Sequence, residues 1–118
     1  MGDFEDIMGM QTVTRNVLEK VIEKKVKTYA QSLGWKTFKF VSPANPSVCD
    51  RIFVNRYGVV IFIEFKQKGK NLTPKQQQHA DALKANLANV FMIDNIEDGI
   101  ALVNKWHNSV SVITHDFF

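Results

Sequence analysis

The 118-residue sequence predicts an α/β domain with a mixed sheet of four to five strands flanked by helices. Three observations predict this class. Residues 50–66 form two apolar stretches around a glycine-containing turn, as in a hairpin of two strands. An apolar run at 90–94 follows a helical pattern, and a strand after a helix favours a right-handed parallel crossover. The order of predicted elements is helix, three strands, helix, strand, helix (α-β-β-β-α-β-α).

The first helix is predicted to begin near Asn16, because Asn16 and Glu19 have the spacing of a capping box. It is predicted to end at Gly34. Residues 1–15 lack periodicity and are predicted to form a flexible arm, so residues 16–118 form the predicted domain. The core-facing stripe of this helix has apolar residues at helical spacing: Leu18, Ile22, Val26, Tyr29 and Leu33.

The remaining elements follow from alternation, caps and apolar runs. Residues 42–48, with two prolines, are predicted to form a loop. The second helix starts after Thr73, with Pro74 at its first position and Gln76 at its third. Outside the hairpin, the predicted strands are Trp35–Val41, Val90–Asp94 and Ser109–Thr114. The last predicted helix is Asn95–Trp106.

The length of the hairpin turn decides which residues face each other. A three-residue loop, with Gly58 at positive φ, places Asn55 opposite Val59 and therefore Asp50 opposite Glu64. Lys66 then shares the face of Glu64 through the period of two. A two-residue loop would instead send Asp50 to the opposite face.

Two carboxylates on one face repel each other unless a cation, a basic partner or a shared proton compensates. Oxygen ligands on rigid strands suit Mg²⁺ or Mn²⁺, which can also take phosphate oxygens as ligands. Asp50 and Glu64 are therefore predicted metal ligands, and Lys66 can stabilise charge on a phosphate. The neighbouring basic segment is predicted to follow a nucleic-acid backbone through Lys68, Lys70 and Lys75.

These residues resemble a known family. The ordered set Asp50, Glu64-Phe65-Lys66 and Thr73-Pro74-Lys75-Gln76 resembles the PD-(D/E)XK nuclease superfamily, and more narrowly its virus-type replication-repair nuclease (VRR-NUC) domain. The similarity runs from residue 22 to about residue 100 and implies a restriction-endonuclease-like core. The family usually has proline before the aspartate, where this chain has Cys49. That departure implies a changed loop rather than a lost catalytic group.

The resemblance implies a metal-dependent DNA endonuclease, acting on branched or junction DNA as a homodimer. It implies that Asp50, Glu64 and the carbonyl of Phe65 hold Mg²⁺ or Mn²⁺. Glu23 adds a carboxylate directly or through water. Lys66 then activates or stabilises the attacking water, and Gln76 orients the site.

Several alternatives stay open. Glu19 rivals Glu23 by periodicity, and the family spacing to Gly34 favours Glu23. Gln76 can be a helix cap, a site residue or both. Lys39 can lie along DNA or simply point outward from its strand. The whole domain can alternatively be a non-catalytic nucleic-acid-binding or assembly module on the same fold.

Bulk properties narrow the class of protein. The net charge of +3 agrees with a polyanionic partner without requiring one. A single cysteine excludes an internal disulfide and favours a reducing compartment. No apolar run has the length of a membrane span. The predicted location is therefore the cytoplasm, that of the host cell if the protein is viral, with no membrane partner.

Overall fold

The computed structural model describes residues 3–40 and 51–111, with side chains from residue 18 onward. Its elements follow the predicted order of helices and strands. They are α1 (Asp3–Ser32), β1 (Lys36–Lys39), β2 (Arg51–Val54), β3 (Val60–Phe65), α2 (Pro74–Ala85), β4 (Asn89–Ile93) and α3 (Ile96–His107).

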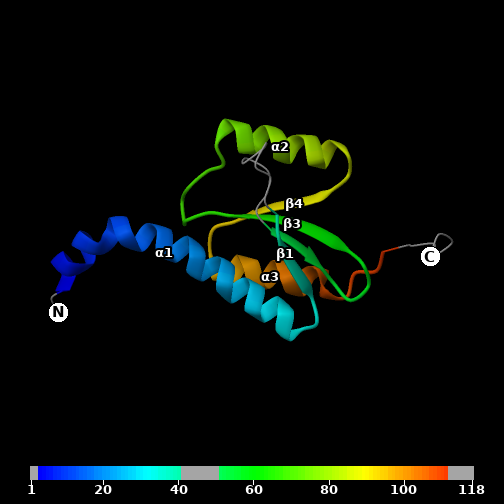
Figure 1. The fold of residues 1–118 in the computed structure, drawn as a ribbon, viewed down its shortest axis with the longest axis horizontal. Coiled ribbons are helices and arrows are strands. Elements are labelled where there is room, and N and C mark those ends of the chain that lie inside the picture. The colour runs from blue at the N-terminus through cyan, green and yellow to red at the C-terminus, as the bar shows by residue number, and fades with distance from the viewer. Residues whose placement is uncertain (1–2, 41–50, 112–118) are drawn as a thin grey trace.

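The sheet has the strand order β1-β2-β3-β4 and is mixed, as predicted. β1 pairs with β2 and β2 with β3 in antiparallel fashion, whereas β4 runs parallel to β3 after the α2 crossover. Figure 1 shows α2 on one face of the sheet and α1 with α3 on the other. Residues 109–111 are not a strand, so the described sheet has four strands, and residues 112–114 of the predicted fifth lie outside the described residues.

The hairpin register is the one that the three-residue loop predicts. The Asn55 amide donates to the Val59 carbonyl at 3.0 Å, Gly58 has φ +83°, and Arg51 pairs with Ile63. Asp50, the predicted partner of Glu64, lies outside the described residues. The described part of the hairpin therefore confirms the turn on which the prediction for Asp50 depends.

Asn55 holds this turn against α3. Its side chain is buried, and its Oδ1 accepts the backbone N–H groups of Tyr57 and Val59, each at 2.9 Å. Its Nδ2 donates to the carbonyls of Trp106 and Ser109, also at 2.9 Å. A buried polar side chain is tolerated when its donors and acceptors are paired in this way.

The larger core lies between the sheet and the pair α1 and α3. Phe53, Ile61, Ile63 and Phe65 alternate along β2 and β3 on this face and pack with Trp35, Val26 and Val103. The helices approach closely, because a Cβ built at Gly99 would lie 2.3 Å from Val26 Cγ2. A smaller cluster under α2 contains Ala80 and Val90, packed with Phe62, Leu72 and Leu83.

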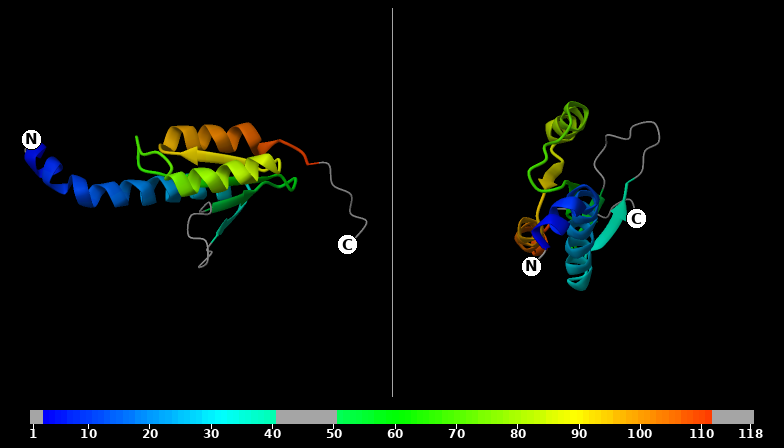
Figure 2. Two further views of the ribbon diagram at one scale, coloured as in Figure 1. Left: turned by 90° about the horizontal axis from the view of Figure 1, so that it is seen from above. Right: turned by 90° about the vertical axis from the view of Figure 1, so that its left-hand side faces the viewer.

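The first helix is longer than predicted. It begins at Asp3, so Asn16 lies within the helix and the predicted helix start there was wrong. Once a helix is nucleated, adding residues costs little, and the segment 3–15 contains no proline to stop it. Figure 2 shows this N-terminal part of α1 running past the sheet. Leu18 is exposed rather than core-facing because α1 has already left the sheet there. Even with this 30-residue helix, none of the described helices is long and apolar enough to cross a membrane.

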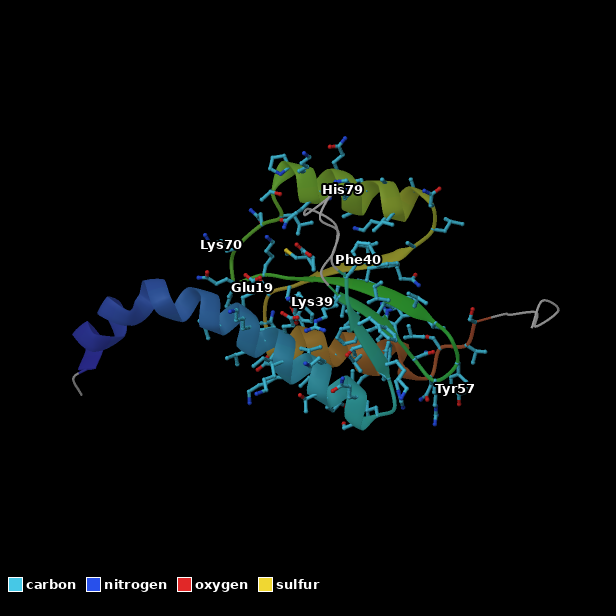
Figure 3. The ribbon with its side chains drawn as sticks, in the orientation of Figure 1. Glu19, Lys39, Phe40, Tyr57, Lys70 and His79 are labelled. Atoms are coloured by element: carbon cyan, nitrogen blue, oxygen red, sulfur yellow. The ribbon has the colours of Figure 1, made fainter. Side chains whose placement is uncertain are left out.

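The first strand is shorter than predicted and lies at the edge of the sheet. Trp35 and Phe40 flank β1 instead of belonging to it, and Val41 lies outside the described residues. Phe38 and Phe40 are exposed, on the part of the molecule that α2 does not cover. Figure 3 places Lys39 and Phe40 at the end of this strand.

Candidate functional site

Glu64 is an acid on a buried strand. It occupies the last position but one of β3, between Ile63 and Phe65, which point into the core under α1 and α3. Alternation therefore directs Glu64 to the α2 face. Its side chain is only 4% exposed, and burying a carboxylate is costly unless it is paired or hydrogen-bonded. Gln76 of α2 supplies a hydrogen bond, with Nε2 donating to Glu64 Oε1 at 2.7 Å.

Gln76 also closes the start of α2. Thr73 Oγ1 accepts the Gln76 backbone N–H at 3.2 Å, and Gln76 Oε1 accepts the Thr73 backbone N–H at 3.0 Å. A backbone N–H can only donate, so the amide oxygen must face Thr73 and the amino group must face Glu64. Gln76 thus forms the predicted helix cap and also contacts Glu64, while its role in a catalytic site stays a prediction.

Glu23 lies on the other face of the sheet. Its carboxylate forms an ion pair with the Nε of Arg51, and both side chains are largely buried. Arg51 pairs with Ile63 across the hairpin and shares its face, the face under α1 and α3. The Glu23–Arg51 pair and the Glu64–Gln76 pair therefore lie on opposite sides of the sheet. Glu19, the rival of Glu23, is half-buried one turn earlier on α1.

The end of β3 places the other predicted residues beside Glu64. The Phe65 side chain is fully buried, and the backbone N–H of Lys66 donates to the Ile93 carbonyl at 2.9 Å, which continues the pairing with β4. The Lys66 side chain is half-buried. Among the described side chains, those of residues 18–40 and 51–111, no three His, Cys, Asp or Glu cluster as a metal site requires. Asp50, the second predicted ligand, is not among these residues.

The basic loop between β3 and α2 is anchored to β4. The Gly69 backbone N–H donates to Asp94 Oδ2 at 3.2 Å, and Gly69 has φ +82° in a turn closed by the Lys70 N–H and the Gln67 carbonyl. The hydrogen bond from Asn95 lowers the pKa of Asp94, and the Gly69 N–H and the charge of Lys68 lower it further. The sequence placed Asp94 at the end of the predicted strand Val90–Asp94 and gave no sign of this anchoring role, and in the structure the strand ends one residue earlier.

The predicted DNA-contacting lysines are all at the surface. Lys68, Lys70 and Lys75 are exposed around the start of α2, and Lys39 is exposed at the end of β1. Figure 3 shows Lys70 in the loop before α2 and Lys39 across the sheet from it. Lys39 pairs with Arg51, and Arg51 pairs with Ile63 next to Glu64, while Lys68 and Lys70 follow β3 in the loop to α2.

Comparison with known proteins places this arrangement in a family. No family model matches the sequence. A solved structure described as a VRR_NUC domain is similar with a TM-score of 0.69 at 21% identity, over 75% of this chain and 96% of that one. "Putative nuclease p44" of Acyrthosiphon pisum secondary endosymbiont phage 1 is 37% identical over 67 residues, which are 56% of this chain and 72% of that protein. The chain belongs to the same family as this phage protein, and its fold is that of a VRR-NUC domain.

These likenesses confirm the predicted resemblance and the restriction-endonuclease-like fold. β3, the third strand of the sheet, ends at Glu64-Phe65 with Lys66 directly after it, and the helix that carries Gln76 leads to the fourth strand. The described members of the ordered motif thus lie around one end of β3, where Gln76 contacts Glu64.

Proposed function

We propose that this VRR-NUC domain is a metal-dependent endonuclease that hydrolyses phosphodiester bonds in DNA, with preference for branched or junction structures. The observation that carries the proposal is the buried Glu64 carboxylate held by Gln76 at the end of β3. A buried carboxylate costs stability in a strand that is only structural, whereas a metal-dependent nuclease needs carboxylates as metal ligands. The nuclease named among its phage relatives agrees with this activity.

The proposed metal ligands are Asp50, Glu64 and the carbonyl oxygen of Phe65. These are hard oxygen donors, which suit Mg²⁺ or Mn²⁺ better than softer metals. The bound cation would supply polarisation of the phosphate and a lower pKa for water. Glu23 is the proposed additional carboxylate. Glu23 lies on the face of the sheet opposite Glu64, so its proposed contribution is indirect and acts through its ion pair with Arg51, the residue next to Asp50 in the sequence.

The protein residues perform the remaining work. A water gives up one proton to solvent, and its oxygen forms a bond to phosphorus in line with the sugar oxygen that leaves. The P–O bond to that sugar oxygen breaks, and the sugar oxygen takes up a proton from solvent. The ammonium of Lys66 stabilises the negative charge that develops on the attacking hydroxide and the phosphoryl oxygens. Gln76 keeps the Glu64 carboxylate in one orientation, so that the site needs little reorganisation during the reaction.

The proposed DNA path uses Lys39, Lys68, Lys70 and Lys75. Each is exposed, and lysines that neutralise phosphates make binding fall steeply with salt. A homodimer would supply two such paths related by a two-fold axis, as symmetric cleavage of a junction requires. Light scattering at working concentration tests this, because a monomer there would contradict the dimer.

Two variants test the chemistry. Glu64→Ala and Lys66→Ala should each reduce cleavage of branched DNA at least about a hundredfold while leaving DNA binding largely intact. A Lys105→Ala variant on α3, far from the motif in sequence, serves as the lysine control. Cleavage at the wild-type rate by either site variant would overturn the assignment. Salt-dependent DNA binding without any metal-stimulated product would instead favour a non-catalytic binding module.

A further inference from the structure

A cavity of about 250 Å³ lies between α2 and β4, directly beside Glu64 and Gln76. Its inner wall is apolar and includes Ala80 and Val90, which are 2% and 6% exposed. Met92 of β4, 39% exposed, lines the same cavity. Gln77 and Lys84 of α2 also line it. The cavity is therefore a built pocket that continues from the candidate site.

The size and the lining restrict what can enter. Sites for drug-sized ligands occupy roughly 300–1,000 Å³, so this cavity fits a smaller group. Apolar walls suit a flat, weakly polar ring. The amide of Gln77 and the ammonium group of Lys84 can form hydrogen bonds to polar atoms on the edge of that ring. The adjacent site, under the proposed function, holds a phosphate of a DNA strand. A nucleobase attached next to that phosphate has the size, the shape and the position that the cavity requires.

We propose that this cavity receives one unpaired nucleobase next to the phosphate that is cleaved. The inference rests on the proposed function and names the feature by which this domain selects its DNA. A base within a duplex is stacked between two neighbours and paired with a third base, so it cannot reach a pocket between a helix and a sheet. Extracting a base costs energy, and the cost is least for one that is already unpaired. Branches, flaps and bulges would therefore be preferred because they present such bases.

Binding in EDTA tests the pocket separately from catalysis. The probe is a hairpin duplex with a single bulged 2-aminopurine, compared with the same duplex carrying an abasic site at that position. Stacking on a protein surface gives a single base an effect of about tenfold or more on affinity. We expect the abasic DNA to bind at least about tenfold more weakly, and the fluorescence of the 2-aminopurine to change on binding. Equal affinity for both DNAs would overturn the inference.

A matched pair of variants locates the effect. Ala80→Leu places a larger side chain into the cavity, whereas Ala82→Leu makes the same change at an exposed position on α2. We expect Ala80→Leu to lose the preference for the bulged base while binding the abasic DNA as wild type does. Ala82→Leu should keep the preference. A preference that survives in Ala80→Leu would contradict the pocket, and the wild-type abasic comparison decides even if Ala80→Leu does not fold.

Cleavage assays distinguish the proposed nuclease activity from the proposed base pocket. With Mg²⁺, we expect the bulged DNA to be cut at least about tenfold faster than the abasic DNA. Equal, metal-dependent rates on both would remove the base pocket and leave the nuclease. A base preference in binding without any cleavage would remove the nuclease and leave the pocket.

Discussion

Gln76 joins the start of α2 to the buried acid of β3. Its Nε2 donates to Glu64 Oε1 at 2.7 Å, while its Oε1 accepts the backbone N–H of Thr73 at 3.0 Å. One amide thus fixes both where the helix begins and how the carboxylate is oriented. Any change at Gln76 is expected to affect helix stability and the site together, unless the substitution separates the two bonds.

Gln76→Glu separates them. Glutamate keeps an acceptor for the Thr73 N–H, because it also serves in capping boxes, but it cannot donate to Glu64 when ionised. Gln76→Glu keeps the cap bond, worth about 1 kcal/mol, that Gln76→Ala loses. It also places a second carboxylate beside the buried Glu64, so we expect the repulsion between the two charges to lower its thermal stability at neutral pH. Both variants should cleave branched DNA at least about tenfold more slowly than wild type. Wild-type cleavage by Gln76→Glu would show that Gln76 is a cap alone.

Asn55→Ala should destabilise the fold more than most single substitutions. It removes four hydrogen bonds, two to the hairpin turn and two to the end of α3, and leaves buried backbone groups without partners. We expect a loss of about 2–4 kcal/mol in the free energy of unfolding, measured with urea. Asn86→Ala, an asparagine at an exposed position, is the control and should change stability by less than about 0.5 kcal/mol. A similar small change in Asn55→Ala would contradict the anchoring role.

The Glu23–Arg51 pair is expected to act as a unit. Removing either partner leaves a largely buried charge alone, so Glu23→Gln and Arg51→Met should each cost about 2 kcal/mol. The double variant should cost less than the sum, with a coupling of about 1 kcal/mol or more in urea unfolding. Additive losses would mean that the ion pair contributes nothing in solution.

The same two variants decide how Glu23 serves the site. If Glu23 acts through Arg51, both variants should raise the Mg²⁺ concentration for half-maximal cleavage by the same factor. A larger rise in Glu23→Gln than in Arg51→Met would contradict an action of Glu23 through Arg51.

Asp94 is expected to make stability depend on acidic pH. Hydrogen bonds from Asn95 and Gly69 lower its pKa in the folded state below the ordinary value of about 3.8. The unfolded state therefore binds the proton more readily, so the stabilisation is present above the unfolded pKa. It is lost as the pH falls through the lowered folded pKa. The melting temperature of Asp94→Ala should thus lie below that of wild type at pH 7, and the difference should shrink in acid. A constant difference across this range would contradict a role for the ionised carboxylate.

The hairpin turn and the start of α2 were predictable from the sequence because each depends on a few neighbouring residues. Gly58 after Arg56-Tyr57 indicated the three-residue turn, and the turn alone sets the hairpin register. Thr73-Pro74-Lys75-Gln76 indicated the start of α2 to the residue. The family motif then indicated that Gln76 belongs with Glu64, and the two side chains are hydrogen-bonded.

The features decided by packing were not predictable. The partner of Glu23 depends on how α1 crosses β2, which no spacing in the sequence specifies. The anchoring roles of Asn55 and Asp94 arise from backbone groups 25 or more residues away. The start of α1 was missed because its first residues have helix-compatible composition without the apolar periodicity that signals a packed helix.

The central claim is metal-dependent cleavage at Glu64. It is tested most directly by incubating end-labelled four-way junction DNA with wild type and with Glu64→Gln, each in Mg²⁺ and in EDTA. The isosteric amide keeps the volume of the buried side chain and removes its charge. We predict that wild type forms product in Mg²⁺ and forms none in EDTA. We predict that Glu64→Gln forms no product in Mg²⁺ or in EDTA. Equal product from wild type and Glu64→Gln, or product that persists in EDTA, would contradict the account.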